Sequence, residues 1–225
     1  MKKPVVDYRQ FRLNKLNDPQ FSHLKLLLGW VWYFCMYFIT ENLIPLEKCH
    51  VIHSKLDDLI PFNEYFLIFY CGWYALIVVS LLYFALYDTG SFRKLSLFIL
   101  GTQIIAMIVY IVYPNRQDLR PEVFERDNFL TRLMAFIYAF DTPSGVCPSL
   151  HVGYSIGIAS TWLKAKDVSP WVKAFITVFV VMICISVAFV KQHSVVDIFA
   201  ALPMCALVEA VVFRDWWRER LHKKA

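Results

Sequence analysis

Six long apolar stretches divide this chain, and they constrain its fold more than any other feature of the sequence. A helix needs about 20 predominantly apolar residues to cross the hydrocarbon core of a bilayer. The chain is 58% hydrophobic and 18% charged, whereas soluble domains are about 45–50% apolar and about 25% charged. We therefore expect an all-α polytopic membrane protein with transmembrane helices at residues 24–43, 65–87, 95–113, 149–163, 171–190 and 193–213.

A shorter apolar segment, residues 129–140, lies in the long polar connection between the third and fourth stretches. Its 12 residues are too few to cross a bilayer. It is therefore predicted to form a short interfacial or re-entrant helix. The chain then comprises a basic N-terminal segment at residues 1–23, a six-helix membrane domain at residues 24–213 and a basic tail at residues 214–225.

The positions of the basic residues predict the orientation of these helices. Six crossings place both ends on one side, and the lysines and arginines near the ends make that side cytoplasmic. The net charge of +5 reports topology rather than nucleic-acid binding. Four arginines in one loop on the opposite side run against the positive-inside rule: Arg116, Arg120, Arg126 and Arg132. We interpret this cluster as an indication of an anionic ligand at the extracytoplasmic face.

A histidine and an aspartate four residues apart, His193 and Asp197, lie between the fifth and sixth stretches. Residues at this spacing share one face of a helix, so the carboxylate of Asp197 is expected to reach a ring nitrogen of His193. That contact would fix the tautomer and leave the other nitrogen as a nucleophile. The structural alternative is a polar pair at a membrane interface that only satisfies its own hydrogen bonds.

Other polar residues are expected on the same face of the membrane. Arg120 offers a guanidinium group that forks onto phosphate oxygens. Ser149 begins the fourth stretch after a proline, where free N–H groups and a hydroxyl bind anions. His151 can protonate a leaving oxygen, and Lys191 adds a cation two residues before His193. This set indicates phosphoryl transfer by fixed positive groups, and no metal-ligand spacing is visible.

The motifs are Arg120-Pro121, Pro148-Ser149-Leu150-His151 and Ser186-x6-His193-x3-Asp197. They resemble the motifs of the type 2 phosphatidic acid phosphatase superfamily of membrane lipid phosphatases, over about residues 95–213. The resemblance implies a six-span architecture in which His193 is the nucleophile, Asp197 orients it and His151 is the general acid. It also implies that Arg120 and Ser149 hold the phosphate.

The chain departs from the motifs of that family at three positions. Tyr113 stands where the first motif has lysine, Leu150 where the second has glycine, and Val187 where the third has arginine. The nearest cations that can replace the missing ones are Arg116 and Lys191, although loop solvation explains Arg116 and snorkelling explains Lys191 equally simply. These departures resemble the inositol-phosphoceramide synthase and sphingomyelin synthase branch, whose members move a phospho-headgroup between lipids.

Three functions remain open. The first is hydrolysis of a phosphomonoester or pyrophosphate of a lipid through a phosphohistidine, and the second is headgroup transfer between lipids by the same first step. The third, of another class, is a non-catalytic lipid transporter or scramblase. We expect a lipid phosphate and the bilayer as partners, no nucleic acid, no cofactor and no metal, with the cell membrane as the location. The oligomeric state and a disulfide between Cys49 and Cys147, which needs an oxidising compartment, stay open.

Overall fold

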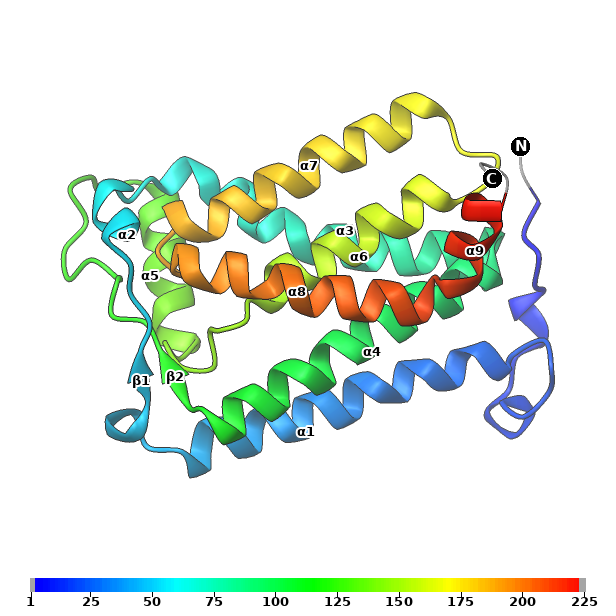
Figure 1. Cartoon of the computed structure of the whole chain (residues 1–225), viewed down its shortest axis with the longest axis horizontal. Helices are drawn as coiled ribbons and strands as arrows, with labels where there is room; N and C mark the ends of the chain where they lie inside the picture. Colours follow the sequence, from blue (N-terminus) through cyan, green and yellow to red (C-terminus); the bar gives the residue numbers. More distant parts are fainter. Residues whose placement is uncertain (1–2, 223–225) are drawn as a thin grey trace.

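The computed structural model describes residues 3–222, which form an elongated bundle of helices (Figure 1). The helices are α1 (Leu28–Leu43), α2 (Lys55–Leu59), α3 (Leu67–Tyr87), α4 (Thr89–Val112), α5 (Phe129–Phe140), α6 (Leu150–Lys164), α7 (Pro170–Phe189), α8 (Val195–Val212) and α9 (Arg214–His222). Two short strands, β1 (His50–Val51) and β2 (Asn115–Arg116), lie at one end of the bundle together with α2 and α5 (Figure 1). We call this the site end, and the opposite end, where the first and last described segments lie, the terminal end.

The predicted apolar stretches all form helices, with some ends displaced. The largest displacement is in α4, which begins at Thr89 rather than at residue 95. The side chain of Asp88 accepts a hydrogen bond from the backbone N–H of Ser91 at 3.0 Å and caps the helix. The polar residues after Asp88 are therefore the first turn of α4. At the start of the bundle a 3-10 helix, Ser22–Leu27, precedes α1, so the α-helix proper begins at Leu28.

Within the described residues, four helices are long and apolar enough to cross a membrane: α3, α4, α7 and α8. This is consistent with an integral membrane protein. Two more helices, α1 and α6, pack against them but have only 16 and 15 residues. At 1.5 Å per residue, α6 is about 22 Å long, shorter than a hydrocarbon core of about 30 Å. The short α5 lies across the site end of the bundle (Figure 1).

Helix α6 packs against four others, α3, α4, α7 and α8. Close packing depends on Gly157, because a Cβ atom there would lie 2.4 Å from Cδ1 of Phe98 in α4. Buried hydrogen bonds fix α6 further: Gln103 Nε2 donates to the Tyr154 hydroxyl at 2.8 Å, and Trp162 Nε1 donates to the Ser80 hydroxyl at 2.9 Å. Buried polar groups are stable only when paired in this way. These contacts hold rigid the helix that carries His151.

The connections at the site end are joined through the side chain of Asn115. Strands β1 and β2 pair in parallel, with His50 opposite Asn115. Asn115 Oδ1 accepts from the backbone N–H groups of Val146 at 2.9 Å and Cys147 at 2.8 Å. The segment before α6 is thereby fixed to the end of α4. The thiols of Cys49 and Cys147 are free.

Candidate active site

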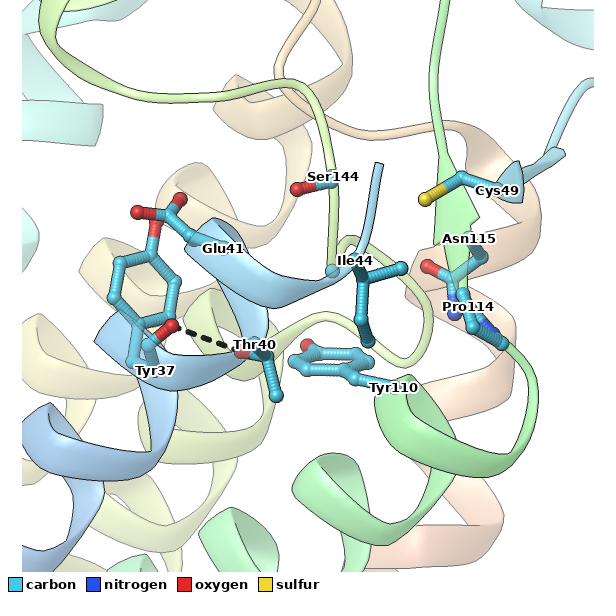
Figure 2. A pocket seen from close by; sticks show the side chains of 10 residues that line it. Tyr37, Thr40, Glu41, Ile44, Cys49, Tyr110, Pro114, Asn115 and Ser144 are labelled. Atoms are coloured by element: carbon cyan, nitrogen blue, oxygen red, sulfur yellow. Dashed lines mark hydrogen bonds between the residues drawn. The ribbon is translucent and has the colours of Figure 1, made fainter. Parts of the chain in front are cut away.

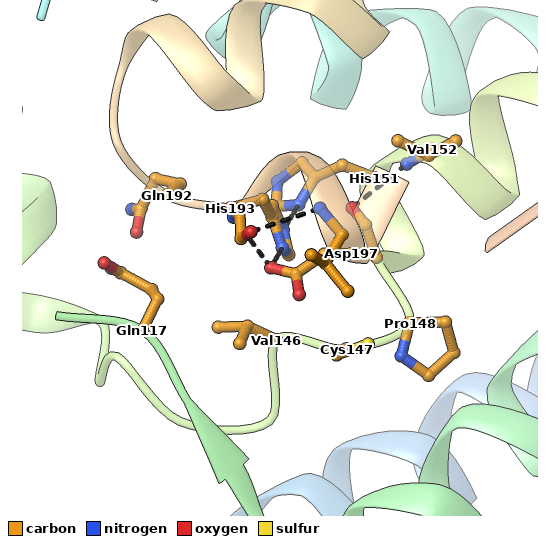
Figure 3. A network of polar contacts seen from close by, with 12 residues as sticks. Gln117, Val146, Cys147, Pro148, His151, Val152, Gln192, His193 and Asp197 are labelled. Atoms are coloured by element: carbon orange, nitrogen blue, oxygen red, sulfur yellow. Dashed lines mark hydrogen bonds and ion pairs between the residues drawn. The ribbon is translucent and has the colours of Figure 1, made fainter. Parts of the chain in front are cut away.

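His193 and Asp197 lie at the turn between α7 and α8 (Figure 3). His193 Nδ1 is 3.2 Å from Asp197 Oδ2, and both side chains are buried, with 7% and 0% exposed. The predicted pair therefore exists, but His193 lies before the helix rather than on its face. Ser194 caps α8, and Asp197 reaches back to accept from the Ser194 backbone N–H at 2.9 Å. This capping box brings the carboxylate to the histidine.

His151 lies in the first turn of α6 and faces His193. The distance from His151 Nδ1 to His193 Nε2 is 3.2 Å. The ring of His151 also lies against Tyr70 and Trp73 of α3, with centroids 4.7 and 4.2 Å away. These rings fix its orientation, and its Nε2 atom is buried without a hydrogen-bond partner in the part of the chain that the structure describes. Two residues 42 positions apart thus form a polar centre with Asp197.

Ser149 is the N-cap of α6 and is completely buried. Its hydroxyl accepts from the backbone N–H of Val152 at 3.4 Å, and its own N–H donates to the carbonyl of Asp197 at 3.1 Å. The second of these bonds joins the start of α6 to the start of α8. Ser149 therefore fixes the two histidine-bearing segments relative to each other, and its hydroxyl is engaged in capping.

The guanidinium group of Arg120 is directed at the chain rather than at open space. It donates to the carbonyls of Tyr138 (3.1 Å), Asp141 (2.7 Å) and Thr142 (3.2 Å). It also donates to Gln192 Oε1 at 2.8 Å, beside His193. Arg120 therefore holds the segment after α5 against the turn that carries His193.

The structure does not bring the other two predicted phosphate cations to the histidines. Lys191 Nζ donates to the carbonyls of Asp57 (2.9 Å) and Ile60, on the side of the turn that faces α2. Arg116 pairs with Asp118 at 3.1 Å, beside β2. Neither residue lines the cavity that contains the histidines. The proximity of Lys191 to His193 in the sequence did not predict the partners of Lys191, which lie more than 130 positions away. Arg116 has a local loop partner.

A cavity of about 590 Å³ extends from His151 and His193 toward the middle of the bundle. Its walls come mainly from aromatic and aliphatic side chains of α1, α3, α5 and α6. Phe34 and Val78, near the middles of α1 and α3, line it and are 59% and 55% exposed. The cavity therefore reaches the side of the bundle as well as its site end. An apolar, concave space beside polar groups is typical of a ligand site.

Sequence reasoning missed a carboxylate in the cavity wall, Asp141. Its Oδ1 atom accepts from the Tyr37 hydroxyl at 3.0 Å, and its Oδ2 atom lies 3.6 Å from Arg120. Burial raises the pKa of Asp141, while the bond from Tyr37 and the charge of Arg120 oppose that rise. No motif marks Asp141 in the sequence, so only the fold reveals it.

A second, smaller pocket of about 20 Å³ lies between the end of α1 and the strand β2, and its size suits a single water. Figure 2 shows Glu41, Ser144 and Tyr110 around it. Glu41 accepts a hydrogen bond of 2.5 Å from the Thr142 hydroxyl, which joins α1 to the segment after α5. Like Asp141, Glu41 belongs to no motif.

Within residues 3–222, no group of three or more histidine, cysteine, aspartate or glutamate side chains is arranged to hold a metal ion. The polar centre thus consists of two histidines and one carboxylate, at the head of an aromatic cavity. Comparison with models of protein families, with curated proteins and with solved structures finds no match to the chain.

Proposed function

We propose that this protein is a membrane enzyme that removes the phosphate of a lipid phosphate or pyrophosphate through a phosphohistidine on His193. The observation that carries the proposal is the alignment of Asp197, His193 and His151, with contacts of 3.2 Å on both sides of the His193 ring. A carboxylate, a nucleophilic ring and a second ring in this order match the roles of orienter, nucleophile and proton donor.

The membrane arrangement is part of the proposal. The helices α1 and α6 cross the bilayer together with the four long helices, and α5 lies at its surface or re-enters it. Both chain ends face the cytoplasm, and the site end faces the extracytoplasmic side. Because α6 is short, the histidines then lie slightly below the surface, at the depth of a lipid phosphate. The side opening of the cavity admits the lipid chains from the bilayer.

In the first chemical step, His193 Nε2 attacks phosphorus and the bond from phosphorus to the lipid oxygen breaks. The contact with Asp197 favours the tautomer with hydrogen on Nδ1, which leaves the Nε2 lone pair free. His151 protonates the departing lipid oxygen. Asp197 stabilises the positive charge that develops on the His193 ring.

In the second step, water attacks the phosphohistidine and His151 removes its proton. The bond from phosphorus to His193 breaks, and phosphate and the neutral ring are released. Phosphorus must enter between the two histidines, whose nitrogens are 3.2 Å apart in the free protein. Reacting atoms approach to about 3–3.5 Å before bond formation, so one ring must move away from the other when substrate binds.

The test uses purified protein, a phosphatidate-like or polyprenyl pyrophosphate substrate, and a metal chelator. We expect phosphate release by the unaltered protein and its loss, by about 10⁴-fold or more, in His193→Ala. Substrate binding should survive this change, because the cavity wall is otherwise intact. Full activity of His193→Ala would contradict the mechanism, and movement of lipid without phosphate release would favour a transporter.

Transfer of a headgroup to another lipid is the second candidate, and the charge of the cavity wall favours it. Asp141 lines the cavity, whereas the nearest cation, Arg120, is occupied by carbonyl groups. A phosphodiester, with a single negative charge, fits such a wall better than a doubly charged monoester. Two substrates decide between the two: a lipid phosphate with labelled phosphorus and a phosphodiester lipid with a labelled headgroup. Free labelled phosphate from the first supports hydrolysis, and a new labelled lipid formed from the second only with added lipid alcohol supports transfer.

A further inference from the structure

The turn that carries His193 is held by the short helix α2, which lies far from it in sequence. Asp57 of α2 is buried, with 2% exposed. Its Oδ2 atom accepts a hydrogen bond from the Ser194 hydroxyl at 2.6 Å, and its Oδ1 atom accepts from the backbone N–H of Val195 at 2.7 Å. Ser194 and Val195 begin α8. A carboxylate from a separate segment thus caps the helix that carries Asp197.

A second connection joins the same two segments, and here the side chain belongs to the turn and the backbone carbonyls belong to α2. Lys191 Nζ donates to the carbonyls of Asp57 and Ile60, at the end of α2, where a cation is favourable because the last carbonyls of a helix lack partners. Burial lowers the pKa of Lys191, and the nearby carboxylates of Asp57 and Asp58 oppose that change. Lys191 also has a φ of +50°, in the left-handed region that non-glycine residues seldom adopt. The residues on both sides of His193 are therefore fixed to α2.

These contacts leave Asp57 no role in substrate binding. Besides the two bonds from α8, its Oδ2 atom accepts from the backbone N–H of Ser54 at 2.7 Å. A buried carboxylate is stable when its oxygens are paired in this way. Neither Asp57 nor Lys191 lines the cavity. Both act through the position of the turn.

We propose that Asp57 is a positioning residue for His193, with Lys191 as its reciprocal anchor, so that the connection before α3 controls the reactivity of the nucleophile. The inference rests on the proposed function. Its physical basis is the short distance between the two histidines, 3.2 Å. A displacement of about 1 Å at a reacting group can cost about 100-fold in rate. The clamp formed by Asp57, Lys191 and Ser194 prevents that displacement of the backbone at the turn, while the histidine rings remain free to rotate apart when substrate binds.

The test compares Asp57→Ala and Asp57→Asn with Asp58→Asn as the matched control. We expect kcat for lipid phosphate hydrolysis to fall about 100-fold in Asp57→Ala. The fall should be smaller in Asp57→Asn, because the amide oxygen still accepts from one donor. KM should stay within about twofold, since the cavity is untouched. Asp58 is 63% exposed and pairs with His53 at the surface, so Asp58→Asn should match the unaltered protein.

The Lys191→Met variant distinguishes an anchoring role of Lys191 in the clamp from direct binding of substrate phosphate. If Lys191 is an anchor, this change lowers kcat and leaves KM and inhibition by inorganic phosphate unaltered. If its ammonium group instead binds substrate phosphate, KM rises and phosphate inhibits less strongly. The second result would overturn the reciprocal role assigned to Lys191.

Amide hydrogen exchange, measured by mass spectrometry, tests the clamp without any reaction. In Asp57→Ala, exchange across residues 191–197 should rise by about tenfold or more, because Val195 loses its acceptor. Exchange within α4 should stay unchanged, which shows that the variant folds. Unchanged exchange at the turn, or an unchanged kcat, would overturn the proposal. Absence of turnover even in the unaltered protein would contradict the proposed function, and the exchange result would still decide whether Asp57 holds the turn.

Discussion

Lys164 at the terminal end of the bundle and two cations at the site end, Arg120 and Lys191, are held in different ways. At the terminal end, Lys164 Nζ lies 2.6 Å from Glu209 Oε1, and over the rings of Phe213 and Trp216 at 4.4 and 4.7 Å. At the site end, Arg120 and Lys191 donate mainly to main-chain carbonyls. Lys164 is therefore held by side chains, whereas Arg120 and Lys191 are held mainly by the backbone.

The difference between these partners shows which part of the structure each cation stabilises. The partners of Lys164 lie on or beside helices whose backbone hydrogen bonds are already complete, so this cation reinforces helix packing. The carbonyls bound by Arg120 and Lys191 belong to the last turns of α5 and α2 and to the segments that follow them, where carbonyls lack helical partners. These cations therefore fix loops, and the loops position His193. Changes at the site end should affect turnover and stability together, whereas changes at the terminal end should affect stability alone.

The largest effect among the comparisons below is expected for His151→Ala at the site end. Loss of the proton donor should lower kcat by about 10²–10⁴-fold. A phosphate ester with a good leaving group, such as a nitrophenyl ester, needs little protonation, so the rate of its first step, measured as a burst of nitrophenol, should fall much less. An equal loss in the first step with both substrates would contradict the role of His151 as general acid.

Arg120→Lys should have the next largest effect. A lysine cannot fork onto several carbonyls at once, so the free energy of unfolding should fall by about 2–3 kcal/mol. Because Gln192 beside His193 loses its donor, kcat should also fall by about tenfold. Thermal unfolding in detergent and lipid phosphate hydrolysis measure the two quantities. A rise in KM at constant kcat would show instead that Arg120 binds phosphate directly.

The smallest effect on turnover is expected for Lys164→Met at the terminal end. The pair is largely buried, with 11% of Lys164 and 19% of Glu209 exposed. Removing the ammonium group leaves Glu209 without its cation and should lower the free energy of unfolding by about 1–3 kcal/mol. The kcat should stay within about twofold of the unaltered value. A loss of turnover as large as that of Arg120→Lys would break the distinction between the two ends.

Much of the fold could be predicted from the sequence, because apolar stretches of this length have few alternatives to helices. The range 129–140 coincides with α5, and the other helix ends moved by a few residues where caps such as Asp88 determine them. Four of the six predicted spans meet the length and hydropathy expected for crossing a membrane. The stretch at residues 24–43 begins with a 3-10 helix, so α1 is shorter than predicted, whereas α6 has the 15 residues predicted for the range 149–163.

The candidate site could be predicted in part. The places of His151, His193 and Asp197 at helix starts could be predicted, because the spacing of His193 and Asp197 and the starts of the helices are local features of the sequence. The partners of Lys191 could not be predicted, since Asp57 and Ile60 lie 134 and 131 positions away, whereas Arg116 pairs locally with Asp118. Asp57 and Asp141 are single carboxylates without a motif, and only the packing of the site end reveals their contacts.

Direct detection of the covalent intermediate is the measurement that tests the central claim. The protein is mixed briefly with a lipid phosphate that carries labelled phosphorus, quenched at alkaline pH, digested and mapped by mass spectrometry. The account predicts an acid-labile phosphoryl group on His193, absent from His193→Ala. Rapid turnover with no labelled histidine, or a stable label on Ser149 instead, would contradict it.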